Sequence, residues 1–392
     1  MPDLSNLVDI AELAQAMGKQ YVFVALERCL PVRHRKARCR QCVDVCPAQA
    51  VTVKENKVQV DHSQCVGCGA CTTVCPAEAL VPLDPPDAKL QSDAELLLQH
   101  AAEKGLPEGT VCVACARKAA RHEADDQAFV EVPCLCRVHE SFLVGLVARG
   151  ATDLALVDAD CATCKLGHCE ETTNRVVESA TKLLEAQGCD ARIRRTSHFP
   201  QGMPGYRARA LSETRRAFFT SSADSGKKAA EKTARFFIRR EAQKDTTVAM
   251  VLDAFGLTAE QEADLVEPHR RTHLIDALYE VGQPAQETLD SRLFGSVEID
   301  NGKCNICNIC TVVCPTKALH RSDKDGKDAP GSALISFWPS DCIQCHLCED
   351  VCFRKCVTVG SEVRLDQLFS FEPAALVKKR PTSAENRQRN RA

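Results

Sequence analysis

A run of four closely spaced cysteines constrains this chain more than any other feature. Cys65, Cys68, Cys71 and Cys75, followed by Pro76, form the pattern C-x2-C-x2-C-x3-C-P. Three cysteines at steps of three curl one short loop around three corners of a [4Fe–4S] cube, and the fourth ligates a second cluster. One such run is incomplete by itself, so it predicts a partner run elsewhere in the chain.

The cysteine content favours metal binding over disulfides. The chain has 392 residues, of which 25 are cysteine, and its length suggests two to four domains. No basic stretch followed by an apolar core marks the N-terminus for export, and no apolar run approaches the roughly 18 residues of a membrane span. We therefore expect a cytoplasmic chain without a membrane span, whose thiols bind metal.

The charge argues against nucleic acid as a partner. The formal net charge is −3 before any cluster is counted. An oxidised cube with its four thiolates carries a net charge of about −2, so the loaded protein should be clearly more acidic.

A second, imperfect run precedes the first. It reads Cys39-x2-Cys42-x3-Cys46-Pro47 and lacks the leading cysteine. Cys29 is the substitute, because a loop can bring it back at a small entropic cost. Between the runs, residues 50–60 alternate apolar and polar side chains, which predicts a hairpin.

Two cluster loops joined by a hairpin resemble the bacterial two-cluster ferredoxin, here over residues 29–82. The resemblance implies crossed ligation, in which the last cysteine of each run binds the cluster of the other run. One cube would be held by Cys29, Cys39, Cys42 and Cys75, and the other by Cys65, Cys68, Cys71 and Cys46. The basic loop at residues 33–40 is either a solvated loop that offsets cluster charge or a docking patch for an acidic partner.

The same pattern recurs near the C-terminus. Cys304, Cys307, Cys310 and Cys314 form a complete run, and Cys342, Cys345, Cys348 and Cys352 form another. Crossed ligation would place Cys304, Cys307, Cys310 and Cys352 on one cube and Cys342, Cys345, Cys348 and Cys314 on the other. Cys356 falls where the other runs have alanine, so we interpret it as a packed thiol rather than a ligand. His346 is interpreted as a neighbour that tunes the cluster.

The middle of the chain changes its hydrophobic period. Short apolar runs at 110–114, 129–133, 153–159 and 191–196 alternate with helical stretches at 138–148 and 170–186. This alternation predicts a parallel α/β layer. Seven cysteines lie on these runs or shortly after them, and the carboxyl ends of parallel strands meet at one edge of a sheet. We therefore expect cysteines that are distant in sequence to converge there.

This segment also resembles a known family. Val111-Cys112-Val113-Ala114-Cys115, Val132-Pro133-Cys134-Leu135-Cys136 and Gly150–Val157 followed by Cys161 are similar to the delta (electron-transfer) subunit of methyl-viologen-reducing hydrogenases. The resemblance implies a small α/β domain whose two-iron cluster connects a hydrogenase or formate dehydrogenase to a heterodisulfide-reductase-like flavoprotein. Cys136 departs from the family, which tends to have glycine there.

The resemblance leaves seven thiols for four ligand positions. The predicted ligands of this [2Fe–2S] cluster are Cys112, Cys115, Cys134 and Cys161, with Cys169 and then Cys164 as substitutes. Cys189 is predicted to be structural. Zinc is an alternative to iron, because it also binds four cysteines.

These observations predict an α+β multidomain protein. Its expected parts are a ferredoxin module (1–83), a linker helix with a parallel, flavodoxin-like α/β domain (84–200), a helical connector (201–292), a second ferredoxin module (293–372) and a disordered basic tail (373–392). Ser92 and Glu95 suggest a capping box that opens the linker helix.

The sequence predicts an electron-transfer subunit with four [4Fe–4S] clusters and one [2Fe–2S] cluster. No phosphate loop, dinucleotide fingerprint or nucleophile elbow is present, so we expect a non-catalytic subunit of an oxidoreductase complex. The expected partners are a hydrogenase, a formate dehydrogenase or a flavoprotein reductase. The alternative hypothesis is a thiol redox or sulfur-transfer enzyme in the central domain, fed by the ferredoxin modules.

Overall fold

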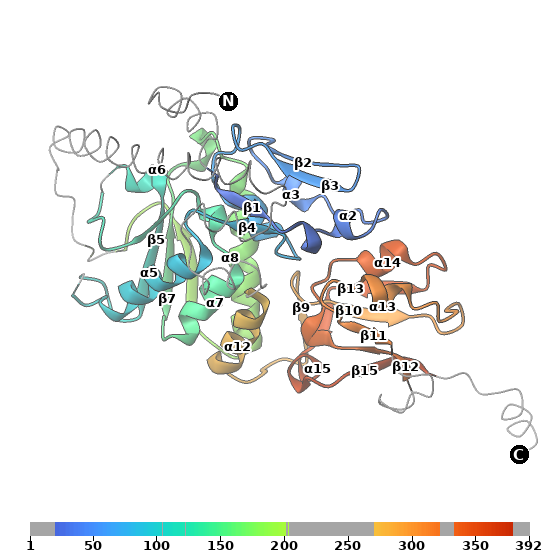
Figure 1. Cartoon of the computed structure of the whole chain (residues 1–392). Coiled ribbons are helices and arrows are strands. Elements are labelled where there is room, and N and C mark those ends of the chain that lie inside the picture. The colour runs from blue at the N-terminus through green and yellow to red at the C-terminus, as the bar shows by residue number, and fades with distance from the viewer. Residues whose placement is uncertain are drawn as a thin grey trace, which may run out of the picture.

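The computed structural model describes residues 20–103, 105–121, 123–200, 203, 270–321 and 333–378. The chain forms a small N-terminal module, a central domain and a C-terminal module that lies against both (Figure 1). Most of the predicted connector (201–292) and the part of the predicted tail after residue 378 fall outside the described residues.

The N-terminal module is built from short elements around its cysteine runs. They are β1 (Val22–Val24), a 3-10 turn η1 (Leu26–Arg28), α2 (Leu30–Arg33), α3 (Gln41–Asp44), β2 (Val51–Lys54), β3 (Lys57–Val60), α4 (Ala70–Val74) and β4 (Leu80–Pro82). Strand β1 pairs antiparallel with β4, and β2 pairs with β3. Glu55 and Asn56 have φ values of 50° and 59°, as the tight turn of a hairpin requires. The predicted hairpin is confirmed.

The C-terminal module repeats this plan. Its elements are β9 (Thr288–Asp290), β10 (Ser296–Ile299), α13 (Ile309–Val313), β11 (Leu319–Arg321), β12 (Ala333–Phe337), η5 (Pro339–Asp341), α14 (Leu347–Val351), β13 (Val357–Gly360), β14 (Glu362–Arg364), α15 (Leu365–Ser370) and β15 (Ala374–Lys378). Strand β10 pairs antiparallel with β13, as β1 does with β4. Strand β15 pairs with β12 and lies within the segment predicted as a tail, so the folded module extends to residue 378.

The central domain contains a four-stranded, fully parallel sheet, as the alternating periods predicted. Its strands are β5 (Thr110–Cys115), β6 (Val130–Val132), β7 (Asp153–Val157) and β8 (Arg192–Thr196), in the spatial order β6-β5-β7-β8. The helices are α5 (Asp87–Gln99), α6 (Ala116–Ala119), α7 (Glu140–Ala148), α8 (Cys169–Ala186) and α12 (Arg270–Val281), and the 3-10 turns are η2 (Leu135–Arg137) and η3 (Cys161–Thr163).

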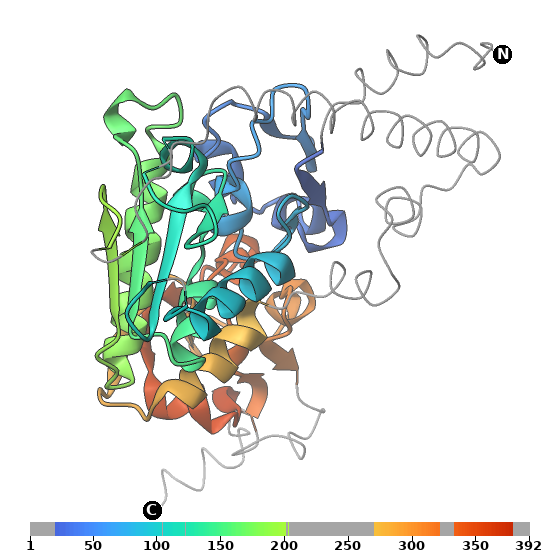
Figure 2. The ribbon, with the colours of Figure 1, turned by 90° about the vertical axis from the view of Figure 1, so that its left-hand side faces the viewer.

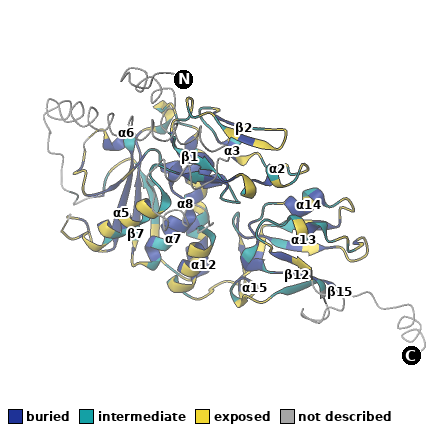
Figure 3. Cartoon of the chain, viewed as in Figure 1, coloured by how far each residue is buried: buried dark blue, intermediate teal, exposed yellow. Residues whose placement is uncertain are grey.

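The two faces of this sheet are covered differently. Val111 and Leu154 face the main core, to which α5, α7, α8 and α12 all contribute. Cys112 and Ala155 face a smaller cluster with Phe129 and Ala119. Helix α5 packs on β5, β6 and α7, and α12 packs on α7 (Figure 2). Figure 3 shows the buried strands and inner helix faces.

Helix α5 begins earlier than the sequence predicted. The capping box was expected at Ser92, but the helix starts at Asp87, after Pro86. Asp87 accepts hydrogen bonds from Arg137 at 2.6 Å and from Arg270 at 2.7 Å. A carboxylate in the first turn of a helix is stabilised by the helix dipole. Asp87 also pairs with the cations Arg137 and Arg270, and these contacts favour a helix start at Asp87.

The two ferredoxin-type modules touch each other directly. Leu30 of α2 packs against Leu347 and Val351 of α14, and Cys39 and Cys345 border the same apolar cluster. The contact places one predicted ligand of each module at a shared boundary.

Candidate iron–sulfur sites

The backbone of the cluster loops is strained in a repeating way. In each run with complete spacing, the residues on both sides of the middle cysteine have a left-handed φ; they are Gly67 and Gly69, Ile306 and Asn308, and Gln344 and His346. This conformation is costly for an L residue, and most for a β-branched one such as Ile306. Glycine takes this conformation freely in the first run, and the other two runs adopt it with L residues. The shared backbone conformation indicates that all three loops curl tightly enough to bring their cysteines together.

The segment after each run repeats as well. The residue three positions after the last cysteine is left-handed in all four runs: Gln49, Glu78, Lys317 and Lys355. This turn directs the next backbone N–H at the sulfur in three of them. Ala50 donates to Cys46 at 3.3 Å, Ala79 to Cys75 at 3.2 Å and Cys356 to Cys352 at 3.4 Å. The fourth run therefore keeps this geometry although it lacks the proline.

Three of the four predicted ligand sets each line one small cavity. The first cavity is lined by Cys29, Cys39, Cys42 and Cys75. The second is lined by Cys304, Cys307, Cys310 and Cys352, with Cys356 beside them. The third is lined by Cys314, Cys342, Cys345 and Cys348. The walls are otherwise mostly apolar, so four converging thiols in such a pocket fit a cysteine-bound cluster.

The fourth set is Cys46, Cys65, Cys68 and Cys71. Burial raises the pKa of Cys71 well above its usual value, and the nearby Cys68, Cys65, Cys42 and Cys46 raise it further. Cys71 is therefore close to the other three thiols of its set and also to Cys42 of the first set, and Cys68 also faces the central domain.

Burial makes these thiols poor thiolates unless metal binds them. It raises the pKa of Cys29 to about 11 and the pKa values of Cys42 and Cys345 to about 12. A buried thiolate lacks water to stabilise it, and a metal ion that replaces the proton supplies that stabilisation. The donor set thus suits a metal better than free thiols.

The structure separates Cys112 and Cys115 from each other. Both lie within β5, and residues three apart on a strand point to opposite faces of the sheet. Cys112 lies in the smaller cluster, which contains no other cysteine among the described residues. Cys115 borders the main core. The predicted set Cys112, Cys115, Cys134 and Cys161 is therefore not gathered at one place.

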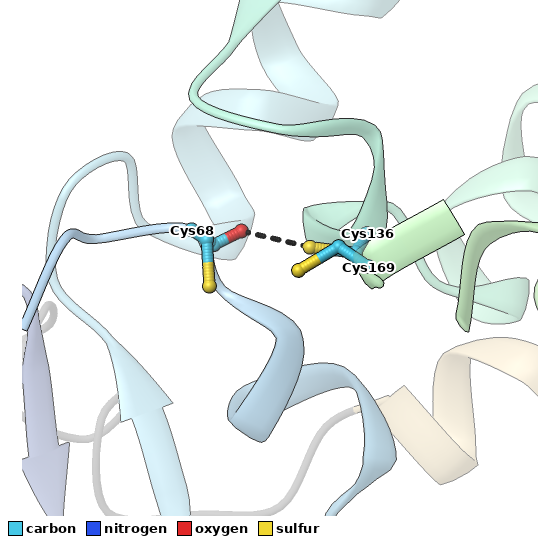
Figure 4. A group of neighbouring side chains, drawn as sticks. All are labelled: Cys68, Cys136 and Cys169. Atoms are coloured by element: carbon cyan, nitrogen blue, oxygen red, sulfur yellow. Dashed lines mark hydrogen bonds between the residues drawn. The ribbon is translucent and has the colours of Figure 1, made fainter. Parts of the chain in front are cut away.

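A different group of thiols meets at the boundary with the N-terminal module. The sulfur atoms of Cys68, Cys136 and Cys169 lie within 4.8 Å of one another, and all three residues are buried (Figure 4). Cys134 interacts with Cys136 and Cys169. This group could not be predicted from the sequence, because Cys68 already belongs to a complete cysteine run, and the run needs no thiol from the central domain.

The remaining central cysteines lie nearby or apart. Cys161 follows β7, and its sulfur accepts a hydrogen bond from Arg195 at 3.4 Å. The sulfur of Cys164 accepts one from the backbone N–H of Leu166 at 3.5 Å. Cys189 packs against the main core, in line with the structural role predicted for it.

Helix α12 brings two arginines to the two ferredoxin-type modules. Arg270 donates to Asp87 and, at 2.6 Å, to the carbonyl of Thr72 in α4. Arg271 donates to the carbonyl of Ser340 at 2.8 Å and stacks on Phe294. No carboxylate of a described residue forms an ion pair with Arg271, and Cys342 lies within its electrostatic reach. These two roles could not be predicted from the sequence, because arginines are common throughout residues 200–290.

Comparison with known protein families agrees with the two flanking modules. Models described as a 4Fe-4S dicluster domain match residues 37–79 and 296–353. The chain thus carries two such ferredoxin-type domains, one before and one after the parallel-sheet domain in the sequence. These two domains support [4Fe–4S] binding and an electron-transfer role. No curated protein matches the sequence. None of the helices in the described ranges is long and apolar enough to cross a membrane.

Proposed function

We propose that this chain is an electron-transfer subunit that holds four [4Fe–4S] clusters and a further iron–sulfur centre in its central domain. It would relay low-potential electrons between a partner oxidoreductase and an acceptor. When bound, each cluster supplies a one-electron centre whose potential depends on hydrogen bonds to sulfur, solvent access and charge. The observation that carries the proposal is the convergence of separate cysteine quartets on small apolar cavities.

The arrangement of the modules supports a relay. Leu30, Leu347 and Val351 form an apolar cluster between the modules, and Cys39 and Cys345 pack against it, so packed protein joins a ligand set of one module to a ligand set of the other. Amide donors to Cys46, Cys75 and Cys352 would stabilise negative charge on sulfur. The proposed partners are a hydrogenase, a formate dehydrogenase or a flavoprotein reductase of the heterodisulfide-reductase kind.

Metal analysis tests this function. Anaerobically purified full-length chain should contain about 16 Fe in cubes and about two more in the centre, with acid-labile sulfide and reduced-state EPR signals. Cys29→Ala should remove or alter the signal of one cube, and Cys189→Ala should leave every signal unchanged. A wild-type chain without iron or sulfide would refute the proposal.

One observation favours the alternative of a thiol enzyme. Hydrogen bonds from Cys136 and then Cys169 lower the pKa of the half-buried Cys134 below its usual value, and a low-pKa thiol is what such an enzyme needs. Alkylation of the anaerobic protein separates the two functions. Modification of Cys134 with all iron retained would favour the enzyme, whereas protection until iron is removed would exclude it.

A further inference from the structure

Thiols from both sides meet at the boundary between the N-terminal module and the central domain. Cys68 comes from the loop before α4, Cys136 from the turn η2, and Cys169 is the first residue of α8. Their sulfur atoms lie within 4.8 Å of one another. The Cys136 thiol also donates to the carbonyl oxygen of Cys68 at 3.3 Å (Figure 4).

The backbone permits this contact through one glycine. Gly69 follows Cys68 and has a φ of +81°, and a Cβ there would lie 2.4 Å from Cδ of Arg137. Arg137 is almost completely buried, and Asp87 holds its guanidinium at 2.6 Å. Any side chain at position 69 would push η2 away from the cluster loop. The close approach is therefore built into the fold.

The central domain contributes enough thiols for a centre of its own. Cys134 and Cys136 flank Leu135 in η2, and hydrogen bonds link Cys134 to Cys136 and Cys169. Cys169 opens the 18-residue helix α8, whose N-terminal end favours negative charge. Cys161 lies within electrostatic reach of Cys134 and next to the Arg195 guanidinium.

We propose that the metal centre of the central domain is an iron–sulfur centre held by Cys134, Cys136 and Cys169, with Cys161 in the fourth position, and that it lies directly against Cys68 of the N-terminal module. Cys112 and Cys115 are then packing residues. This inference rests on the proposed function for the presence of iron, and it departs from the ligand set implied by the family resemblance.

The thiol positions give a role to Cys136, where the family that the sequence resembles tends to have glycine. A glycine there would remove the thiol that touches both Cys68 and Cys169. With cysteine, a thiol from η2 completes the group at the module boundary. The motif of its run assigns Cys68 to the neighbouring cube. Ligands of the two centres would then be in contact through Cys68, Cys136 and Cys169.

Single substitutions in the full-length, anaerobically purified chain test the ligand set. Cys136→Ser and Cys169→Ser should each lose about two Fe per chain and the two-iron EPR signal, while the cube signals remain. Cys112→Ala, a buried thiol on the same sheet, and Cys189→Ala should keep the wild-type iron content. Retained cube signals from the C-terminal module report that each variant has folded.

The opposite pattern would overturn the proposal. Loss of the two-iron signal in Cys112→Ala, with iron retained in the Cys136 and Cys169 variants, would assign the ligands to β5. A wild-type chain with cube signals but zinc or no metal in the centre would also overturn it and leave the proposed relay intact. Absence of all cube signals would instead refute the function itself.

The contact with Cys68 has its own readout. In the half-reduced wild type, the two-iron signal should relax faster than that of an isolated centre, because a paramagnetic cube lies close to it. Cys68→Ala, which removes one cube ligand, should change that relaxation, whereas Cys307→Ala in the C-terminal module should not. Equal relaxation in wild type and Cys68→Ala would contradict the adjacency.

Discussion

The backbone N–H of Arg38 donates to a carboxylate oxygen of Asp350 at 3.0 Å, although 312 positions separate the two residues. The Arg38 guanidinium also lies 3.4 Å from the same carboxylate. Arg38 belongs to the basic loop for which the sequence left two alternatives, a solvated loop and a docking patch for an acidic partner. Part of this loop binds the other module of its own chain.

Asp350→Ala should loosen the contact between the two modules. It leaves the Arg38 amide without its acceptor and removes a pair whose arginine is largely exposed, which together amount to about 1 kcal/mol. Hydrogen exchange at the Arg38 amide should accelerate accordingly. Glu349→Ala, which removes a partner of the exposed His346, is the control, and equal exchange in both variants would show that the contact does not hold the modules.

Arg271→Gln should lower the reduction potential of the cluster site that contains Cys342. Burial lowers the pKa of Arg271 to about 10, yet it keeps a positive charge at neutral pH. A buried cation favours an added electron, so its loss should shift the potential down by about 60 mV, equivalent to about 1.4 kcal/mol for one electron. EPR-monitored redox titration measures this shift.

Two further variants separate charge from packing at this position. Arg271→Lys keeps the charge and should move the potential much less than Arg271→Gln does. Arg364→Gln removes an exposed arginine that pairs with Asp366 and should move no potential. Equal shifts in Arg271→Lys and Arg271→Gln would show that the residue acts through packing.

Much of this architecture is readable from periodicity, because local patterns determine local elements. The alternation of apolar runs predicted all four strands of the central sheet, and Glu55 and Asn56 marked the hairpin. The resemblance to a two-cluster ferredoxin implied cysteine quartets, and three of them each line one cavity. Each of these features depends on residues that are close in sequence or on a repeated motif.

The thiol group at the module boundary was not predictable in the same way. The spacing of Cys112 and Cys115 resembles a ligand pair, but within a strand it sends the two thiols to opposite faces. The meeting of Cys68 with Cys169 depends on how two domains dock, and no local pattern encodes that. Gly69 was a possible signal, although its partner Arg137 is far away in sequence.

Asp87→Ala should strongly destabilise the central domain. Asp87, whose side chain is 35% exposed, compensates the buried Arg137 and the partly buried Arg270. Removing one partner of a fully buried ion pair typically costs about 3–5 kcal/mol, and solvent screening at Asp87 should keep the cost below that range. The thermal unfolding midpoint of the loaded protein should fall markedly. Asp93→Ala, which removes an exposed pair with Lys89 on the same helix, should change it little; similar midpoints for the two variants would contradict the role of the network.

His139 should make the protein less stable as the pH falls below about 6.5. Its ring is buried, its Nδ1 accepts the backbone N–H of Phe142, and its Nε2 lies 3.3 Å from Asp87. Burial, reinforced by the nearby Arg270, lowers the pKa of His139 to about 4. A histidine in the unfolded chain has a pKa of about 6.5, so the unfolded state binds the extra proton first.

The contribution of neutral, buried His139 to the free energy of unfolding is therefore complete above pH 6.5 and is lost as the pH approaches 4. At pH 5.5 the loss should be about 1.4 kcal/mol relative to pH 7.5. His139→Asn keeps an acceptor for the Phe142 amide but cannot titrate, so its unfolding midpoint should depend less on pH over this range. Exposed His100→Asn should behave like wild type, and an unchanged pH dependence in His139→Asn would mean that other groups govern the acid sensitivity.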